Sequence, residues 1–307
     1  MTTDKTINDF QPRPRPISEA LQELVDDLNR RRSAGDSITL AGIETGFSDL
    51  DRHTSGMRPG SLIVIASRPS MGKSTFTLNI ASHVAMKTKL PVLMFSMELS
   101  AIAMASKLLS QVGKIETWKL RTADLDENDR KNLDAAKEML KDVPLIVDET
   151  TALTAEEIIA KSRDVIARNG RLGLIVIDYL QLMEPISSED GTTDSYEKVM
   201  SVLKTLARET DTPIILLSQL KRKLEKRRNK RPRMSDLPAR AIGQYSDLLM
   251  FLYRDECYNP DSEYKGMAEI VIGRHRYGPV GMLLLGAMKL EFSEFSNYEV
   301  ACEQTVT

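Results

Sequence analysis

Hydrophobic positions between residues 60 and 220 fall into two alternating kinds of segment. Short, uninterrupted apolar runs, rich in β-branched residues, are separated by longer segments with helical spacing. Uninterrupted apolar runs indicate strands buried on both faces, as in a parallel sheet covered by helices. The expected strands are Leu62–Ala66, Val92–Phe95, Leu145–Val147, Leu174–Ile177 and Ile214–Leu217. The pattern predicts an α/β fold, with a mostly parallel central sheet and helices on both faces.

The intervening segments and the last sixty residues complete this picture. Amphipathic helices are expected at Phe76–Lys87, Ala101–Val112 and Ser195–Glu209. Another helix should begin at a capping box formed by Thr154 and Glu157 and end at Gly170. Closely spaced strand-like runs then predict an antiparallel meander that extends the sheet, at Leu248–Tyr253, Ala268–Ile272, Met282–Leu285 and Lys289–Phe292.

The N-terminal region divides into two parts. Residues 1–16 are polar and end in QPRPRP, which predicts a flexible or extended arm. From residue 17 to 35 a helix is expected that ends at Gly35, with one apolar stripe formed by Ile17, Leu21, Leu24 and Leu28. So short a helix must bury its stripe against its own domain or against a neighbouring molecule. The remaining residues, 36–307, form the α/β domain.

Composition and charge limit the class of protein. The chain has 307 residues, 41% hydrophobic and 28% charged, with a net charge of −2, so any nucleic-acid signal must be local. Two distant cysteines, Cys257 and Cys302, form neither a disulfide framework nor a zinc site. Neither a signal peptide nor an apolar run of membrane-spanning length is present. We therefore expect a cytoplasmic protein without a membrane partner.

The stretch LIVIASRPSMGKSTF, residues 62–76, carries the strongest chemical signal. A buried strand, a turn ending in Gly-Lys-Ser and a helix start form a phosphate-binding loop, although Ser67 replaces the usual first glycine. Lys73 would reach the β- and γ-phosphates of a nucleoside triphosphate such as ATP, and Ser74 would hold Mg²⁺. The alternative is a chance strand–turn–helix. The expected nucleotide-binding residues are Ser67, Arg68, Pro69, Ser70, Met71, Gly72, Lys73, Ser74 and Thr75.

Polar residues follow three other expected strands. Asp178 would be the second residue that holds Mg²⁺, Glu98 could activate the attacking water, and Gln219 could sense the γ-phosphate. Carboxyl ends of parallel strands line the ligand crevice, which favours these roles when the residues are taken together. Taken singly, Glu98 could equally be a helix-capping or solvated glutamate.

Two basic features follow. The segment Lys221–Arg233 holds nine basic residues and one acid, which suggests a mobile loop gripping the backbone of a nucleic acid; the alternative is a solvated surface loop. Arg274 and Arg276 stand two apart on an extended segment and so point to one side, where they could attract a phosphate from another subunit. The expected DNA contacts are Lys221, Arg222, Arg227, Arg228, Lys230, Arg231, Arg233 and, beyond the segment, Arg240.

In combination these motifs resemble the C-terminal motor domain of DnaB-type hexameric replicative helicases. The resemblance runs from about Ile17 to Phe292 and includes, in the family's order, TGFSDLD, ASRPSMGKS, FSMELS, LIVIDYLQLM, LARETDTPIILLSQLKR, KRPRMSDL, FLYRDE and HRYGPVG. It implies a RecA-like ATPase fold and a homohexamer that uses ATP to move along single-stranded DNA and unwind duplex. A helicase loader and primase are further implied partners.

The resemblance also assigns roles. It implies that Glu98 is the catalytic base, Gln219 the phosphate sensor and Arg276 an arginine finger acting across the subunit boundary. Arg274 takes the place of a lysine that reaches the same nucleotide, and the helix at 17–35 matches a linker helix that packs on the adjacent subunit. Where the family usually reads RESGAIEQDAD, this chain reads PARAIGQYSD, and Arg240 would supply the DNA contact.

The family's N-terminal collar domain has no counterpart here, so we expect either a piece of a longer protein or a reduced form, as in a phage or mobile element. The competing class is a RecA-type recombinase on the same fold, which lacks the SQLKR to KRPRMSDL stretch. A ring component without catalysis is disfavoured by intact Lys73, Glu98 and Asp178.

Overall fold

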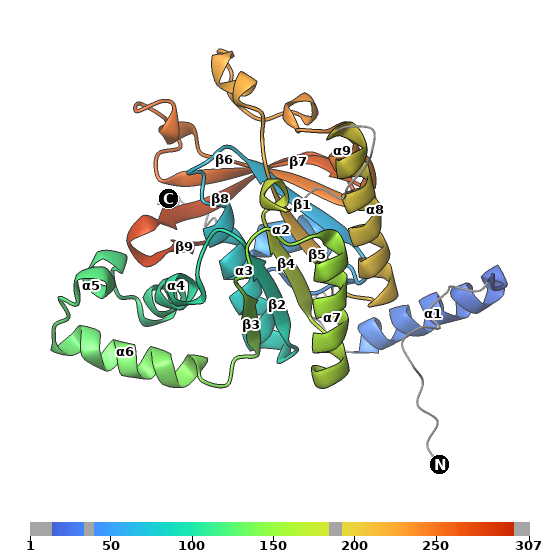
Figure 1. The fold of residues 1–307 in the computed structure, drawn as a ribbon, viewed down its shortest axis with the longest axis horizontal. Helices are drawn as coiled ribbons and strands as arrows, with labels where there is room; N and C mark the ends of the chain where they lie inside the picture. The colour runs from blue at the N-terminus through green and yellow to red at the C-terminus, as the bar shows by residue number, and fades with distance from the viewer. Residues whose placement is uncertain (1–13, 34–39, 184–191, 298–307) are drawn as a thin grey trace, which may run out of the picture.

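A computed structural model describes residues 14–33, 40–183 and 192–297. Figure 1 shows a central sheet with helices on both sides. The helices are α1 (Ile17–Ser33), α2 (Ser48–Thr54), α3 (Lys73–Thr88), α4 (Ala101–Gly113), α5 (Thr117–Thr122), α6 (Glu127–Leu140), α7 (Ala155–Asn169), α8 (Thr192–Glu209) and α9 (Arg240–Tyr245). The strands are β1 (Leu62–Ser67), β2 (Val92–Ser96), β3 (Leu145–Asp148), β4 (Leu174–Asp178), β5 (Ile214–Gln219), β6 (Leu248–Tyr253), β7 (Met267–His275), β8 (Gly281–Lys289) and β9 (Glu294–Phe295).

The sheet has a parallel part and an antiparallel part. In the described residues the strand order is β3-β2-β4-β5-β1-β6-β7-β8-β9. Neighbours from β3 to β6 pair in parallel, and β7, β8 and β9 are added antiparallel. The predicted fold class is confirmed. β6 begins the expected antiparallel meander by pairing antiparallel with β7, and its other edge pairs in parallel with β1.

Burial on both faces explains the uninterrupted apolar runs. All six residues of β1 are buried. Ile63 and Ile65 face a core that includes Phe76 of α3, whereas Leu62 and Val64 face a second core with α7, α8 and α9. Successive side chains of a strand point to opposite faces, so every position of such a strand must be apolar.

Each expected parallel strand between residues 60 and 220 continues past its apolar run. Because the backbone ladder does not depend on side-chain polarity, pairing runs on to polar residues: Ser96 lies opposite Asp178, and Ser67 opposite Gln219. The strand ends that carry the chemistry are therefore themselves part of the rigid sheet.

The predicted limits of α7 agree with its capping contacts. The Thr154 hydroxyl accepts from the Glu157 amide (3.2 Å), and the Glu157 carboxylate accepts from the Thr154 amide (2.8 Å). Gly170 caps the other end with a φ of 78°. These contacts satisfy amides that the first turn of a helix leaves unpaired.

The C-terminal strands pack behind the phosphate-binding loop. The predicted strand Lys289–Phe292 was wrong, because Leu290–Phe292 forms a 3₁₀ turn and pairing resumes at β9. Asn79 of α3 holds β9: its amide oxygen accepts from the Phe295 amide (2.8 Å), and its nitrogen donates to the Ser293 carbonyl (3.2 Å). The Phe295 ring meets Phe76 edge-on at 5.6 Å. This contact links residues more than 200 positions apart, and local sequence patterns do not reveal it.

Helix α1 projects from one side of the domain (Figure 1) and has no buried residue. Its stripe is at least half exposed, from Leu28 at 50% to Ile17 at 75%. Most of the expected arm, residues 1–13, and the expected helix stop at Gly35 lie outside the described residues. None of the described helices is long and apolar enough to cross a membrane.

Candidate active site

A cavity of about 400 Å³ opens at the carboxyl edge of the parallel strands. It brings together most of the residues expected to bind and hydrolyse a nucleotide. Its lining consists of Pro69, Ser70, Gly72, Lys73, Ser74, Thr75, Glu98, Leu99, Lys107, Tyr179 and Gln219. β1, β2, β4 and β5 are neighbours, so the segments that follow them meet at one place.

The phosphate-binding loop connects the end of β1 to the start of α3. Gly72 stands before the first helical residue, Lys73, with a φ of 94°. A Cβ there would lie 2.8 Å from both Met288 and Phe295, so only glycine fits. No side chain caps this helix, and its first amides remain available to an anion together with the positive end of the helix dipole.

Three expected loop residues do not line the cavity. Ser67 is fully buried and donates from its hydroxyl to the Arg68 carbonyl (2.7 Å). Met71 packs in the core. The Arg68 guanidinium turns away, to the Leu220 carbonyl (2.7 Å) and the Glu225 carboxylate (2.8 Å). These residues shape the loop rather than face the cavity.

Asp178 lies beneath the loop and is 2% exposed. Burial, with a smaller contribution from the charge of Glu98, raises the pKa of its carboxyl to about 6, although a hydrogen bond with Ser74 and the charge of Lys73 lower it. Burial likewise lowers the pKa of Lys73, opposed by Asp178 and Glu98. The site holds opposite charges in a desolvated setting, where electrostatic interactions are strong.

The residues present fit a Mg²⁺ ion. Asp178 Oδ1 is buried without a hydrogen-bond partner in the described residues, and Ser74 hydrogen-bonds the same carboxylate. The described residues contain no cluster of three or more His, Cys, Asp or Glu side chains that could hold a metal ion. Mg²⁺ usually needs only one or two carboxylates, with phosphates and water as its other ligands.

Glu98 and Gln219 approach the cavity from β2 and β5, which lie on either side of β4. The Met97 amide donates to the Asp178 carbonyl (2.9 Å), which fixes the chain just before Glu98. Gln181 accepts from the Gln219 amide (2.9 Å) and donates to the Ser218 hydroxyl (3.0 Å). Both contacts hold the end of β5 without using the side chain of Gln219.

Sequence reasoning missed Lys107, Tyr179 and Gln181. Tyr179 directly follows Asp178 and Gln181 comes two residues later, so their place after a strand end was an available signal. Burial raises the pKa of Tyr179, and Glu98 and Asp178 raise it further. Lys107 lies within α4, and no pattern in the sequence distinguishes it from a solvated lysine; burial lowers its pKa.

The basic segment Lys221–Arg233 is partly built into the fold. Instead of the expected mobile loop, residues Arg222–Lys226 form a 3₁₀ turn. Arg227 makes a two-pronged contact with Asp236 (2.8 Å), and Arg231 makes one with the buried Glu269 (2.7 and 2.8 Å). These two arginines, expected at DNA, neutralise carboxylates of their own chain. The other expected contacts that are exposed are Lys221, Arg222, Arg228, Arg233 and Arg240.

Arg274 and Arg276 lie at the opposite edge of the sheet from the cavity. β7 is antiparallel to β6, so its end meets the amino end of the parallel strands: Arg274 lies opposite Leu249, and His275 opposite Leu248. A six-residue strand such as β1 spans about 20 Å. The structure therefore does not bring these arginines to the nucleotide cavity of the same chain.

Comparison with known proteins identifies the family. The sequence model of one protein family, the DnaB-like helicase C-terminal domain, matches residues 42–297 of this chain. The chain belongs to this family. Replicative DNA helicase DnaB of Pasteurella multocida is 40% identical over 287 residues, 92% of this chain and 61% of that protein. DnaB of Geobacillus stearothermophilus is 41% identical over 285 residues, 92% and 62% respectively. This DnaB-like domain thus spans about three fifths of the length of the curated relatives it matches.

Solved structures agree with this assignment. One solved ATPase domain superposes with a TM-score of 0.87 at 32% identity, covering 94% of this chain and all of that one. A DnaB-like replicative helicase, studied with its interactions with primase, gives 0.83 at 33% identity, covering 94% and 68%. The RadB recombinase, at 17% identity and a TM-score of 0.55, shares the fold alone. The recombinase alternative therefore has only the fold in its favour.

The raised pKa of Asp178 predicts how stability depends on pH. Between about pH 4 and 6 the carboxyl is protonated in the folded chain and ionised in the unfolded chain, so the free energy of unfolding falls as pH rises. In chelator without nucleotide, Asp178→Asn should therefore unfold at higher urea than the wild type above pH 6. The gain should approach about 3 kcal/mol and shrink toward pH 4. A gain that is constant with pH, measured by urea titration, would contradict this account.

Proposed function

We propose that this DnaB-like domain hydrolyses ATP with Mg²⁺ and, as a hexameric ring, uses the energy to move along single-stranded DNA and unwind duplex. The observation that carries the proposal is the meeting of Lys73, Ser74, Glu98 and Gln219 around one cavity, with Asp178 beneath it. Family membership supports this use of the cavity. The proposed setting is the cytoplasm of a bacterium, or of a host cell for a phage or mobile element. Binding of a primase or helicase loader stays a prediction.

The proposed reaction is attack of water on the γ-phosphorus. The water oxygen bonds to phosphorus, the bond to the β-phosphate oxygen breaks, and ADP and inorganic phosphate leave. Glu98 takes the proton of the water, Lys73 neutralises phosphate charge, and the Gln219 amide contacts the γ-phosphate or its water. Ser74 and Asp178 would hold Mg²⁺, which neutralises charge on the β- and γ-phosphates. The first amides of α3 hold the phosphates in place.

Glu98→Gln tests the catalytic step. The variant should bind ATP as the wild type does, because the loop and Lys73 are intact, but should hydrolyse it at least about 100-fold more slowly since water activation is lost. Phosphate release and binding of a fluorescent ATP analogue are the measurements. Glu156→Gln, on the exposed side of α7, is the matched control and should behave as the wild type. Normal turnover by Glu98→Gln would remove Glu98 from this role.

For DNA binding, the exposed residues of the basic segment are the candidates. The segment lacks aromatic side chains, which favours contacts with the phosphate backbone over base stacking. Arg68 joins the phosphate-binding loop to this segment through Glu225 and Leu220. This direct link supports a role in which DNA contacts respond to the nucleotide.

The salt dependence of DNA binding tests this role. Each neutralised phosphate on a single strand contributes a log–log slope of about −0.7. Reversing Arg222, Arg228 and Arg233 to Glu should weaken binding to oligo-dT and flatten the slope, while Arg227 and Arg231 stay in place to hold their carboxylates. The control reverses three exposed residues elsewhere, Lys87, Arg121 and Lys131, with the same change in net charge. Equal slopes for the two triple variants would make the segment a solvated surface.

We further propose that Arg276, assisted by Arg274, acts on the nucleotide of a neighbouring subunit. Its position at the far edge of the sheet supports action in trans, since the cavity of its own chain lies beyond the length of a strand. An arginine finger is worth about 10³–10⁵ in rate in other nucleotide hydrolases.

Mixing two inactive proteins tests action in trans. In a ring made from Lys73→Ala and Arg276→Ala chains, some interfaces pair an intact loop with an intact finger. Hydrolysis by the mixture should exceed the sum of the two proteins measured separately. The finger is not supplied in trans if mixed rings form, as shown by mass spectrometry, and no activity returns.

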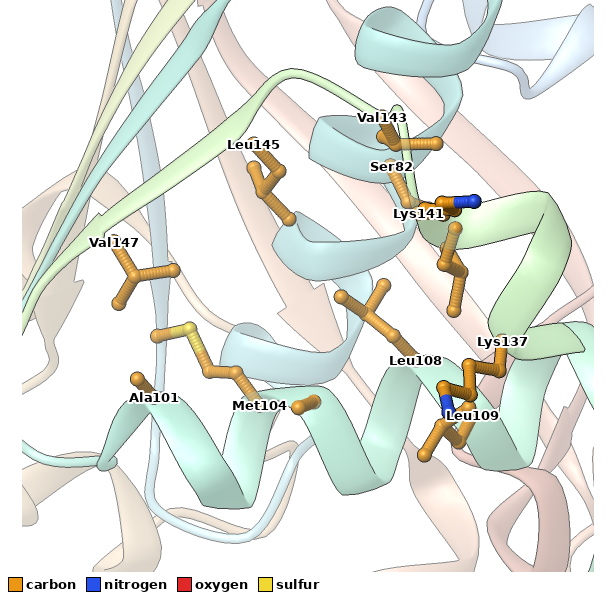
Figure 2. A pocket seen from close by; sticks show the side chains of 12 residues that line it. Ser82, Ala101, Met104, Leu108, Leu109, Lys137, Lys141, Val143, Leu145 and Val147 are labelled. Atoms are coloured by element: carbon orange, nitrogen blue, oxygen red, sulfur yellow. The ribbon is translucent and has the colours of Figure 1, made fainter. Parts of the chain in front are cut away.

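Helix α1 is proposed to dock on the adjacent subunit. The proposed docking surface for α1 on that subunit is a groove of about 330 Å³ between α4, α6 and β3. Its floor is apolar (Figure 2). Met104, Leu108 and Leu145 line it, and Lys137 and Lys141 add positive charge. α1 combines its exposed apolar stripe with acidic residues, which complements both features; the acids are Glu19, Glu23, Asp26 and Asp27.

Changes on either side of this contact should prevent assembly. Leu24→Glu on α1, or Met104→Glu in the groove, should shift the sedimentation of the ATP-analogue-bound protein toward monomers, because each buries a charge in an apolar contact. Gln22→Glu adds the same charge to α1 outside the stripe and should assemble normally. Rings that persist in both Leu24→Glu and Met104→Glu would refute the docking.

A further inference from the structure

Asp247 is a buried carboxylate outside the nucleotide cavity that joins four elements. It lies just before β6, and its side chain is 3% exposed. Oδ2 accepts from the Leu62 amide of β1 (2.8 Å) and from Lys204 Nζ of α8 (2.5 Å). Oδ1 lies 2.7 Å from Nε of Arg276, at the end of β7. The main chain is tied as well: the Asp247 amide donates to the Leu62 carbonyl, and the Arg276 amide donates to the Asp247 carbonyl (both 2.8 Å).

This arrangement gives each carboxylate oxygen a different partner. A buried carboxylate is strongly unfavourable unless cations and hydrogen bonds compensate it. Oδ2 accepts hydrogen bonds from Lys204 and from the Leu62 amide. Oδ1 makes no hydrogen bond in the described residues, so the ion pair with Arg276 is its compensation. The Arg276 guanidinium therefore lies against a buried carboxylate oxygen that has no hydrogen-bond partner in the described residues.

The same contact leaves the reactive end of Arg276 available. The ion pair with Asp247 is made at Nε, and the Arg276 side chain is 45% exposed. Within the described part of the chain, no hydrogen bond involves its Nη1 or Nη2. These two nitrogens form the planar fork that binds phosphate oxygens in pairs. Fixing Nε and the main-chain amide sets the direction of that fork.

We propose that Asp247 is a positioning residue for Arg276: it orients the guanidinium toward the nucleotide of the neighbouring subunit. This inference rests on the proposed action of Arg276 in trans. Asp247 does not itself touch the nucleotide. Its bond to Leu62, at the start of the strand that leads to the phosphate-binding loop, gives the competing interpretation, in which Asp247 supports the active site of its own chain.

Mixed rings separate the two interpretations. Asp247→Asn keeps the size of the side chain but removes the charge that holds Arg276. Alone it should lower kcat at least about tenfold, a part of the 10³–10⁵ that a whole finger is worth. Its KM for ATP should change less than about twofold, because the phosphate-binding loop is unaffected. Mixed with Lys73→Ala, whose finger and Asp247 are intact, it should regain activity above the sum of the separate proteins.

The controls make each failure distinct. Arg276→Ala mixed with Lys73→Ala is the positive control. If it regains activity but the Asp247→Asn mixture does not, Asp247 serves its own chain and the inference is wrong. If neither mixture regains activity although mixed rings form, action in trans is wrong and the positioning role falls with it. Wild-type kcat for Asp247→Asn would also overturn the inference.

Lys204→Met is the matched control on the same carboxylate. It removes the cation from Oδ2 and leaves the Oδ1–Arg276 pair, so its kcat should stay within about threefold of the wild type. Equilibrium unfolding of both variants shows whether each is folded. If Lys204→Met loses as much kcat as Asp247→Asn while folded, orientation of Arg276 is not the cause and the inference is wrong.

Discussion

Burial of the parallel sheet on both faces is the constraint on which the rest of the structure depends. The five central strands of the sheet, which in order are β2, β4, β5, β1 and β6, have no solvated face. Their polar residues therefore gather where the strands end. Ser67, Ser96, Asp178 and Gln219 close four neighbouring strands at the carboxyl edge and remain part of the ladder. A rigid framework therefore presents the site, and desolvation there is strong enough to raise the pKa of Asp178 to about 6. The hydrogen bond with Ser74 and the charge of Lys73 partly offset the cost of that buried charge.

The direction of β7 determines where the remaining chemistry lies. A parallel strand after β6 would have carried the Arg274–Arg276 segment to the same edge as the phosphate-binding loop. Because β7 returns antiparallel, the arginines reach the amino edge, and Asp247 receives Arg276 there. One chain thus has a nucleotide cavity at one edge and a cationic group at the other. This separation is consistent with the proposed action of Arg276 in trans, because contacts around a ring join unlike edges of adjacent chains.

Charge in the basic segment has two uses. Arg227 and Arg231 neutralise Asp236 and Glu269, both buried, and so attach the segment to η4 (Met234–Asp236) and to β7. Other basic residues of the segment remain exposed. Paired arginines hold the segment in place, and exposed ones give it the positive surface that a phosphate backbone attracts. Counting charges along the sequence cannot separate these uses, because the partner acids lie up to 38 positions away.

The sequence by itself determined the parallel strands between residues 60 and 220, the capping of α7, the phosphate-binding loop and the strand-end positions of Glu98, Asp178 and Gln219. These depend on periodicity and on spacing within a few residues, which local physics controls. Tertiary structure decided the parallel pairing of β6, the turn at Leu290–Phe292, the Asn79 contact behind Gly72 and the place of Lys107 in the cavity. It also decided that Arg227 and Arg231 face their own chain and that Asp247 holds Arg276. Each of these depends on which distant segments become neighbours, and side-chain type alone does not record that.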